Sequence, residues 1–397
     1  MTLCGIITDM NTVYVGMSGG VDSSVSALLL KEQGFDVVGI YMKNWSKDLP
    51  GMKCPWAEDL ADAKRVAVKL GIPFEVWDFE EEYRKKVVDY MLDEFKKGNT
   101  PNPDIMCNQE IKFKLFYEKA RAAGADFIAT GHYARVGRFE HNHSGDGLLA
   151  PVVTGLAPSS SVVTSGSPRM VSSQSSSTCL LRAVDENKDQ TYFLYRISEE
   201  ALAHTIFPVG GMMKPEVKKL AEEKGLHNAY KKESMGVCFV GEVGMKDFLK
   251  EYIETEPGEI REIETEKVLG YHEGAVFYTI GQRHGLYLNG EKGIVNDGMP
   301  YYVVKKDLPH NIVYVSKNLN NENLWVNELK LEKIFFRSGL RPVGPSILVR
   351  LRHRAPLIPA RFDGKKLIFA EKIKRPASGQ SAVIYKDEIC LGGGIIA

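Results

Sequence analysis

Length, composition and charge exclude several classes of protein. The 397 residues carry 51 Lys and Arg against 51 Asp and Glu, so no overall field attracts nucleic acid or a membrane, and the six cysteines form no C-x-x-C pair that would indicate a zinc site. No apolar run approaches the about 18 residues of a membrane-spanning helix, and the first basic residue is Lys31, so we expect a cytoplasmic protein of two or three domains with no membrane partner and no targeting segment.

The first predicted elements alternate between strand and helix. From Thr12 to about Tyr133, runs rich in Val, Ile and Phe are separated by helical segments, which is the pattern of a doubly wound parallel sheet in an α/β protein. One helix is predicted from Asp22 to Gln33. Another, from Glu81 to Lys97, repeats apolar side chains at every fourth position, so this stripe should face a core: Tyr83, Val87, Met91 and Phe95.

The character of the sequence then changes twice. Residues 157–178 contain ten serines and one charged residue, so we expect residues 139–178 to form a disordered surface insertion. A helix is predicted to begin at Pro215, and short alternating strands follow from about residue 271, as in an antiparallel β-barrel. We therefore expect a catalytic domain over 1–207, a small central domain that contacts RNA over 208–270, and a C-terminal barrel over 271–397.

The turn after the first strand predicts a phosphate site. It reads SGGVDS and supplies Ser18, Gly19, Gly20, Asp22 and Ser23 at the start of a helix, where backbone N–H groups and the helix dipole attract an anion. The turn lacks the Lys of a Walker A loop and is not G-x-G-x-x-G. It resembles the turn of the PP-loop ATP pyrophosphatases. That resemblance implies cleavage of ATP between its α and β phosphates and adenylation of an acceptor.

Cys107 is the first candidate nucleophile for the adenylated acceptor. It follows two prolines in TPNPDIMCNQ, and we expect Cys107 or Asn108 to cap a helix, where the pKa of a thiol is lowered. Asp104 could accept its proton, but an ionised carboxylate would also oppose a thiolate. The sequence leaves the sum of these two effects open.

Cys238 is the second candidate. It lies in a segment flanked by Gly236 and Gly241, which suits a loop that can move. Taken alone, each of the two cysteines is more often a small buried hydrophobe than a catalyst.

Motifs along almost the whole chain, from Val13 to Ile396, resemble those of the tRNA-specific 2-thiouridylases. They include GMSGGVDSSVSA, TPNPDIMCNQEIKFK, ATGHYAR, NKDQTYFLY, ESMGVCFVGE and YTIGQRHGL. The resemblance implies synthesis of 2-thiouridine at the wobble position of the tRNAs for Lys, Glu and Gln. The serine-rich insertion departs from the family, in which the corresponding link is far shorter.

The resemblance also implies a mechanism and its partners. ATP, with Mg²⁺, adenylates the C2 oxygen of the uridine, and sulfur then displaces AMP. The sulfur would arrive as a persulfide on Cys238 from a cysteine desulfurase or a sulfur carrier protein. Cys107 would attack that persulfide, with Asp104 as the base, and the protein would act as a monomer.

Two sets of site residues follow from the same resemblance. The nucleotide site would comprise Gly16, Met17, Ser18, Gly19, Gly20, Val21, Asp22, Ser23, Met42 and Gly131. The residues approaching the tRNA would be Asn102, Pro103, Asp104, His132, Lys188, Asp189, Gln190, Arg352, His353 and Gln380. Without the resemblance, His132 would be read as a structural histidine.

The residues themselves support RNA binding in one further way. Between Arg341 and Arg375 there are ten Lys and Arg against Asp363 and Glu371, a local charge of +8 in a chain whose total is zero. A solvated charged face is the usual explanation of such a run, but a basic strand pair on a barrel suits contact with RNA phosphates. Two alternatives remain at this stage. One is a PP-loop synthetase that accepts ammonia and needs no paired thiols, and the other is a non-catalytic tRNA-binding or redox-sensing protein.

Overall fold

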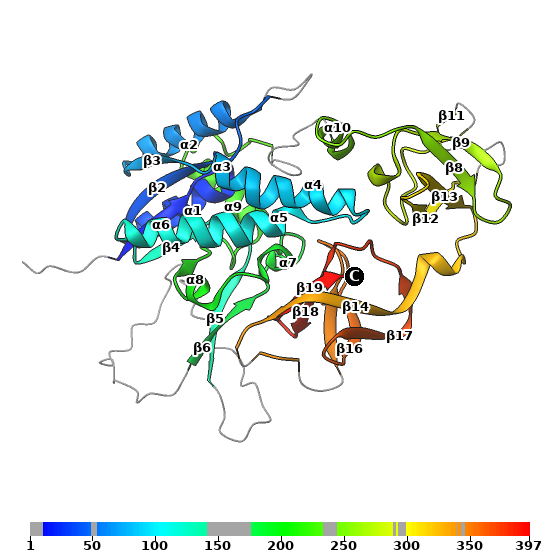
Figure 1. The fold of residues 1–397 in the computed structure, drawn as a ribbon. Helices are drawn as coiled ribbons and strands as arrows, with labels where there is room; N and C mark the ends of the chain where they lie inside the picture. Colours follow the sequence, from blue (N-terminus) through cyan, green and yellow to red (C-terminus); the bar gives the residue numbers. More distant parts are fainter. Residues whose placement is uncertain are drawn as a thin grey trace, which may run out of the picture.

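The computed structural model describes residues 11–48, 54–140, 176–232, 244–288, 291–292, 299–338, 340–342 and 346–397. Cys238 and most of the expected serine-rich insertion lie outside these ranges. At the two ends of the insertion, strands β5 (Arg135–Glu140) and β6 (Ser176–Leu181) continue into it and pair with each other. The described chain forms three units, each built around one sheet (Figure 1).

The first unit contains a parallel sheet with the strand order β3-β2-β1-β4-β7. In β1, Val13 and Val15 face one hydrophobic cluster and Tyr14 faces another, so both faces of the sheet are covered. The predicted doubly wound α/β domain is therefore confirmed. Its strands are β1 (Thr12–Gly16), β2 (Asp36–Lys43), β3 (Phe74–Asp78), β4 (Phe127–Thr130) and β7 (Thr205–Ile206).

Helices cover the two faces of this sheet. Helix α1 packs on one face together with α2 and α9, and the long helix that continues through α4 packs on the other. The predicted stripe Tyr83, Val87, Met91 and Phe95 is buried there, as expected. The helices are α1 (Val21–Glu32), α2 (Trp56–Leu70), α3 (Glu80–Tyr83), α4 (Asp89–Lys96), α5 (Pro103–Met106), α6 (Tyr117–Ala122), α7 (Thr191–Leu194), α8 (Glu199–Ala203) and α9 (Lys214–Glu223), with π-helical turns at Arg84–Val88 and Cys107–Phe116.

The second unit is a six-stranded sheet that follows helix α10 (Met245–Lys250). Its strand order is β11-β10-β9-β8-β13-β12, and the β8–β13 pair is parallel, so the sheet is mixed. The expected boundary at residue 270 passes through β9, inside this sheet. The sequence pattern also predicts a strand at residues 275–281 (AVFYTIG), but this prediction is wrong, because Ala275–Phe277 forms a single 3₁₀ turn. The strands are β8 (Gly258–Glu262), β9 (Val268–His272), β10 (Tyr287–Leu288), β11 (Glu291–Lys292), β12 (Tyr302–Asp307) and β13 (Ile312–Ser316).

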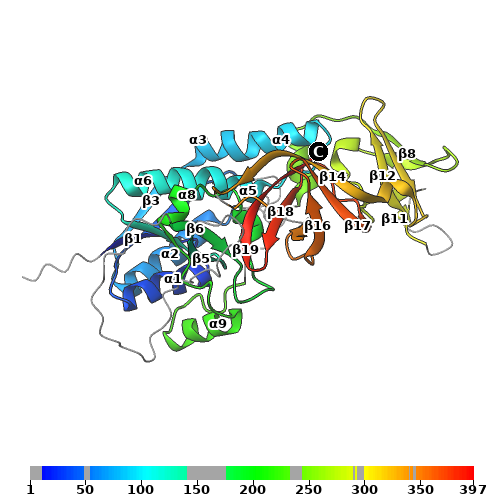
Figure 2. The same ribbon diagram turned by 90° about the horizontal axis from the view of Figure 1, so that it is seen from below.

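The third unit is the predicted antiparallel barrel. Strands β14, β17, β16, β15, β18 and β19 follow one another around it, and pairing of β14 with β19 closes the ring. The β5–β6 hairpin of the first unit extends the same sheet, because β6 pairs with β19 (Figure 2). The barrel strands are β14 (Trp325–Phe336), β15 (Ile347–Arg350), β16 (Ile358–Phe362), β17 (Lys366–Lys374), β18 (Ser381–Lys386) and β19 (Ile389–Ile396).

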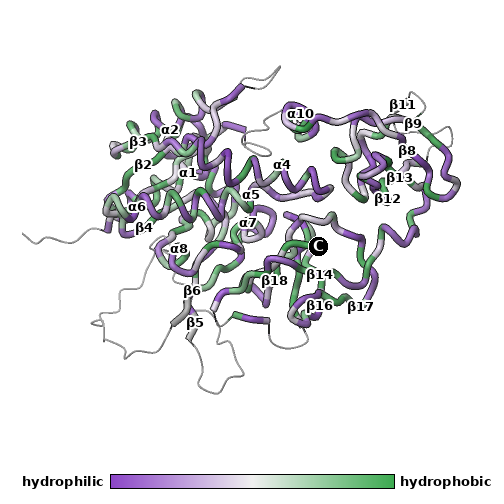
Figure 3. The backbone as a smooth tube through the Cα atoms, in the orientation of Figure 1, coloured by the Kyte–Doolittle hydropathy of each residue, from purple (hydrophilic) through white to green (hydrophobic). Residues whose placement is uncertain are grey.

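Hydropathy follows this architecture. Along α4, hydrophilic and hydrophobic residues alternate, as in a helix with one buried face (Figure 3). A separate apolar cluster fills the barrel, and it includes Leu181 from β6 alongside Val349 and Leu367. No helix within the described ranges has the length and apolar character to cross a membrane.

Candidate functional site

The β1–α1 turn is shaped so that only glycine fits at its centre. Gly19 adopts φ +77°, and a Cβ atom there would lie 2.3 Å from the carbonyl oxygen of Asp59 in α2. A side chain at this position would therefore combine backbone strain with a collision against backbone. The turn thus packs directly on the first turn of α2.

Serine hydroxyls hold the turn in shape. The backbone N–H of Ser18 donates to Ser23 Oγ at 3.2 Å, and the Ser23 and Ser24 hydroxyls donate to the carbonyl of Gly20 at 3.1 and 2.9 Å. Helix α1 begins after Gly20, whose position has no side-chain capping bond. The N terminus of α1 therefore has the backbone N–H groups and the dipole that the predicted phosphate site requires.

Asp22 in this turn accepts hydrogen bonds from two distant residues. Lys214, at the start of α9 and 192 residues away, donates to its two carboxylate oxygens at 2.6 and 2.8 Å. The hydroxyl of Tyr133 donates to Oδ1 at 2.9 Å. The lysine that the turn lacks in sequence is thus supplied by another element and is neutralised by Asp22. Sequence reasoning missed both partners, and the only signal was that Lys214 immediately precedes a predicted helix N terminus.

The other predicted nucleotide residues surround the turn. A Cβ atom on Gly131 would lie 2.6 Å from the backbone nitrogen of Ser23, and one on Gly16 would lie 2.8 Å from Met42 Cε. The side chains of Met17 and Val21 are buried in the core. These two residues can therefore offer only backbone groups to a nucleotide.

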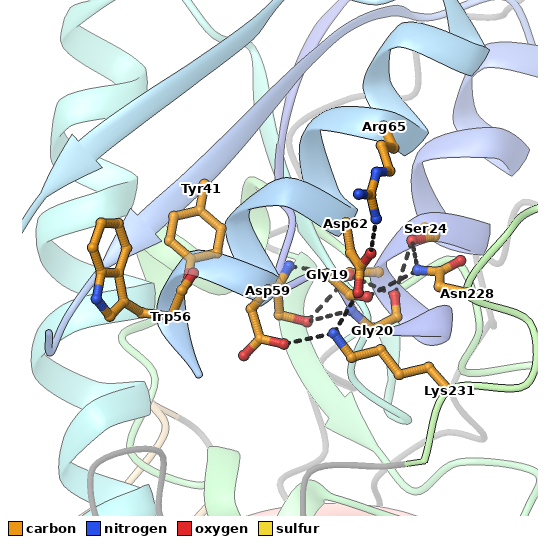
Figure 4. Close-up of polar contacts among 12 residues, drawn as sticks. Gly19, Gly20, Ser24, Tyr41, Trp56, Asp59, Asp62, Arg65, Asn228 and Lys231 are labelled. Carbon is orange, nitrogen blue, oxygen red and sulfur yellow. Dashed lines mark hydrogen bonds and ion pairs between the residues drawn. The ribbon is translucent and has the colours of Figure 1, made fainter. Parts of the chain in front are cut away.

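A second polar cluster fixes the turn from the side (Figure 4). The amide of Asn228 donates to the carbonyl of Gly19 and to Ser24 Oγ, both at 2.9 Å. Lys231 donates to Asp59 at 2.7 Å and to Asp62 at 2.6 Å. Burial alone would raise the pKa of Asp62, but hydrogen bonds from Lys231 and His227 hold that pKa below its usual value. The segment after α9 is thereby tied to both α1 and α2, a contact that the sequence did not indicate.

Cys107 lies inside a helix rather than at its cap, so the predicted capping role is wrong. Asn102 is the cap, and its Oδ1 accepts a hydrogen bond from the backbone of Ile105 at 3.3 Å. The prolines suit this start, because Pro103 occupies the first turn of α5. Cys107 follows α5, opens a π-helical segment and is 5% exposed. Such segments are frequent at functional sites.

Two predicted RNA-facing residues, Asp104 in α5 and His132 just after β4, have shifted pKa values. Burial raises the pKa of the Asp104 carboxyl, and the charge of Lys112 opposes this only in part. A raised pKa suits a group that must take up and release a proton. Burial, with the charge of Lys112, lowers the pKa of His132 well below its usual value, so this imidazole is neutral at pH 7. Its Nδ1 lies 2.8 Å from Thr130 Oγ1.

Asp189 is turned into the protein, and the partly buried Gln190 uses its side-chain oxygen in an internal hydrogen bond. Asp189 is 1% exposed and forms an ion pair of 2.7 Å with the buried Arg350 of the barrel. It also accepts a hydrogen bond from the backbone of Ala183. The side-chain oxygen of Gln190 accepts the backbone N–H of Tyr133 at 2.9 Å. The expected tRNA contact is therefore not available to the Asp189 carboxylate in this structure.

The remaining predicted RNA residues lie on the barrel and near it. Arg352 is exposed, whereas His353 packs against Phe193 in a tilted arrangement, with ring centroids 4.4 Å apart. Burial is the main cause that lowers the pKa of His353 to about 4. The amide of Gln380 donates to the carbonyl of Thr100 in the first unit at 2.7 Å. Within the basic stretch 341–375, Arg350 is buried in the ion pair with Asp189 and adds no charge to the surface. The other basic residues of the stretch supply the surface charge.

The fold and this site together define a class of protein. A doubly wound parallel domain whose first strand enters a lysine-free SGGxDS turn is a PP-loop enzyme of the type that activates an acceptor with ATP. Three family models match in succession: "tRNA methyl transferase HUP domain" over 11–242, "tRNA methyl transferase PRC-barrel domain" over 246–317 and "Aminomethyltransferase beta-barrel domain" over 326–396.

Relatives that match nearly the whole chain identify the family within this class. The protein named tRNA-specific 2-thiouridylase MnmA of Listeria monocytogenes serotype 4b is 44% identical over 390 residues, which is 97% of this chain and 94% of that protein. Those of Lysinibacillus sphaericus and Bacillus licheniformis are each 43% identical over 97% of this chain and over 93% and 94% of their own lengths. The chain belongs to the tRNA-specific 2-thiouridylase family.

Proposed function

We propose that this protein is a tRNA-uridine 2-sulfurtransferase that makes 2-thiouridine at the wobble position. The observation that carries the proposal is the joint presence, in one family member, of the lysine-free phosphate turn and the helix that bears Asp104 and Cys107. Uridine O2 bonds to the α-phosphorus of ATP and pyrophosphate leaves. Sulfur then bonds to C2, and the original oxygen departs with AMP.

The sulfur route uses two thiols. The Cys238 persulfide carries the transferable sulfur, and the Cys107 thiolate bonds to the inner sulfur of that persulfide and releases hydrosulfide. The result is a Cys107–Cys238 disulfide, which a dithiol reductant must reduce before the next turnover. Asp104, whose raised pKa suits proton exchange, takes the Cys107 proton. The persulfide is supplied by a cysteine desulfurase or a sulfur carrier protein.

Mg²⁺ fits this site as a companion of ATP. Within the described part of the chain, no cluster of three or more His, Cys, Asp or Glu side chains could hold a metal ion. Mg²⁺ commonly binds through substrate phosphates, a carboxylate or two and several waters. Both oxygens of Asp22 are paired with Lys214, so the ion would be held mainly by the ATP phosphates and by waters, and it would neutralise charge on the leaving pyrophosphate.

The proposal extends to the substrate and its setting. The substrates are the tRNAs for Lys, Glu and Gln, the protein acts as a monomer, and the reaction takes place in the cytoplasm. Asn102, Lys188, Arg352 and His353 contribute to the RNA-facing surface, and the buried Pro103 and His132 support it from beneath.

The test uses undermodified tRNA, ATP, Mg²⁺ and a persulfide donor. Mass spectrometry of the digested tRNA should show one oxygen replaced by sulfur, with AMP and pyrophosphate released. Cys107→Ser and Cys238→Ser should each abolish the product, while Cys54→Ser, at a buried thiol with no part in the reaction, should keep it. Full activity without either thiol would favour a synthetase that accepts ammonia. Added methyl in place of sulfur would contradict the proposal outright.

A further inference from the structure

The link between α4 and α5 contacts both the second unit, with its six-stranded mixed sheet, and the barrel. This link, residues 98–102, leaves the end of α4 and runs directly into the helix that carries Asp104 and Cys107. Figure 1 shows α4 reaching from the parallel sheet toward the two β units. The link is therefore the place where all three units meet next to the thiol.

The second unit contacts the start of the link. Lys306 of β12 donates from Nζ to the carbonyl of Gly98 at 2.7 Å, and burial lowers the pKa of this lysine to about 8. Gly98 adopts φ +84°, and a Cβ atom there would lie 2.5 Å from Leu308 Cδ1. The hydroxyls of Thr100 and Thr279 are 3.1 Å apart.

The barrel unit contacts the next residues of the link. The backbone N–H of Thr100 donates to the carbonyl of Ser378 at 2.7 Å. The side-chain amide of Gln380 donates to the carbonyl of Thr100 at 2.7 Å and to that of Pro101 at 3.4 Å. Gly379 adopts φ +89°, and a Cβ atom there would lie 2.9 Å from that of Asn99. The backbone of Ser378 and the side chain of Gln380 thus both form hydrogen bonds with the link at Thr100.

We propose that Lys306 and Gln380 are positioning residues that set the orientation of the Asp104–Cys107 helix through the carbonyls of residues 98–101. Each comes from a different β unit, and neither contacts Asp104 or Cys107 directly. These contacts end at Pro101, one residue before Asn102, which caps the N terminus of the helix. Docking of the two β units is therefore a condition for correct presentation of the thiol. The inference rests on the proposed role of Cys107.

This role differs from a tRNA contact for Gln380, and the two make opposite kinetic predictions. A residue that only binds tRNA raises KM for tRNA when it is lost and leaves kcat in place. A positioning residue lowers kcat and leaves KM for tRNA unchanged. Because both side chains act on one link, their effects should also be non-additive.

The experiment compares Lys306→Met, Gln380→Leu and the double variant in single-turnover and steady-state thiolation assays. We expect each single change to lower kcat about tenfold, the size that loss of one hydrogen bond produces, with KM for tRNA unchanged and the double variant falling by less than the product. Lys305→Met, at the exposed neighbouring residue of β12, should keep wild-type kinetics.

A second measurement does not depend on turnover. Alkylation of Cys107 by N-ethylmaleimide, followed by mass spectrometry of its peptide, should be several-fold faster in Lys306→Met and Gln380→Leu than in wild type or Lys305→Met. Unchanged alkylation, or a change in KM for tRNA alone, would overturn the inference. If wild-type protein makes no 2-thiouridine, the proposed function fails. The alkylation rates still decide whether Lys306 and Gln380 orient the helix that carries Cys107.

Discussion

The carboxylate of Asp22 sits in the phosphate turn yet is paired with Lys214 and Tyr133 from outside it. An unpaired carboxylate here would repel the phosphates of ATP, so the pair keeps the turn open to an anion. The buried Lys214 thereby neutralises the carboxylate that the turn carries.

Replacing Lys214 tests this pairing. Lys214→Met leaves Asp22 with Tyr133 alone, and we expect KM for ATP to rise by about one to two orders of magnitude, as for loss of a charge-assisted hydrogen bond. Lys218→Met, on the exposed face of the same helix, is the matched control. Pyrophosphate release at varied ATP concentration measures the change, and an unaltered KM would remove Lys214 from the site.

Buried histidines predict a pH dependence of stability. His132 has its pKa lowered well below the usual value by burial, and burial lowers that of His272 to about 4. Above about pH 6.5 both folded and unfolded chains hold these rings neutral, whereas below it the unfolded chain gains protons first. The free energy of unfolding should therefore fall as pH decreases below about 6.5. Urea denaturation across this range measures it, and His272→Asn should flatten the dependence.

At the scale of an element, the β1–α1 turn is the clearest case of backbone geometry set by packing. Gly19 is forced by the approach of α2, whereas a Cβ atom on Gly20 would meet only Ser18 Oγ, at 3.4 Å. The two neighbouring glycines thus have different reasons to be present.

This difference predicts unequal effects of alanine. Gly19→Ala should lower ATP affinity by at least about tenfold, since the turn must shift away from Asp59, and should lower stability by about 1–3 kcal/mol through the strained backbone. Gly20→Ala, with extended φ and an ordinary contact, should change both much less. Equilibrium nucleotide binding and thermal unfolding of the pair provide the comparison.

The elements divide into those that sequence could predict and those that it could not. The α1 boundaries and the buried stripe of α4 follow from local patterns, because helical period and glycine stops are written into adjacent residues. The partners of Asp22 and Gly19 could not be predicted, because Lys214 and Asn228 are brought in by tertiary packing. The cap at Asn102 was missed in favour of Cys107 or Asn108, although Pro103 at the first helical position is a local signal of a helix that begins there.

At the scale of the whole molecule, the Asp189–Arg350 ion pair joins the first unit to the barrel. Both side chains are buried, so loss of Arg350 leaves the Asp189 carboxylate with the more distant Arg182, at 4.0 Å, as its cationic neighbour.

Breaking this pair should destabilise the protein as a whole. Arg350→Met should lower the free energy of unfolding by about 3–5 kcal/mol, whereas Arg361→Met, on the exposed face of β16, should have little effect. Adding Asp189→Asn, which removes the charge but keeps an acceptor for Ala183 and Thr191, to Arg350→Met should recover much of the loss. Urea unfolding of wild type, of the single variants at Asp189 and Arg350, and of the double variant forms a double-mutant cycle. Independent losses in the two single variants would contradict direct pairing.

The basic surface of the barrel predicts salt-sensitive tRNA binding. The logarithm of the affinity should fall steeply with the logarithm of salt concentration, and Arg352→Gln should reduce that slope by about one if its guanidinium contacts a phosphate. A slope near zero in wild type would contradict RNA binding through this surface.

The β5–β6 hairpin has a consequence for synthesis on the ribosome. Its neighbour on the barrel side, β19 (Ile389–Ile396), comes far later in the sequence than β6, so this edge of β6 stays unpaired until β19 has been synthesised. An open strand edge invites pairing with other chains. Messages cut short before β19 should therefore yield aggregating products, even though every residue of the nucleotide turn has been made.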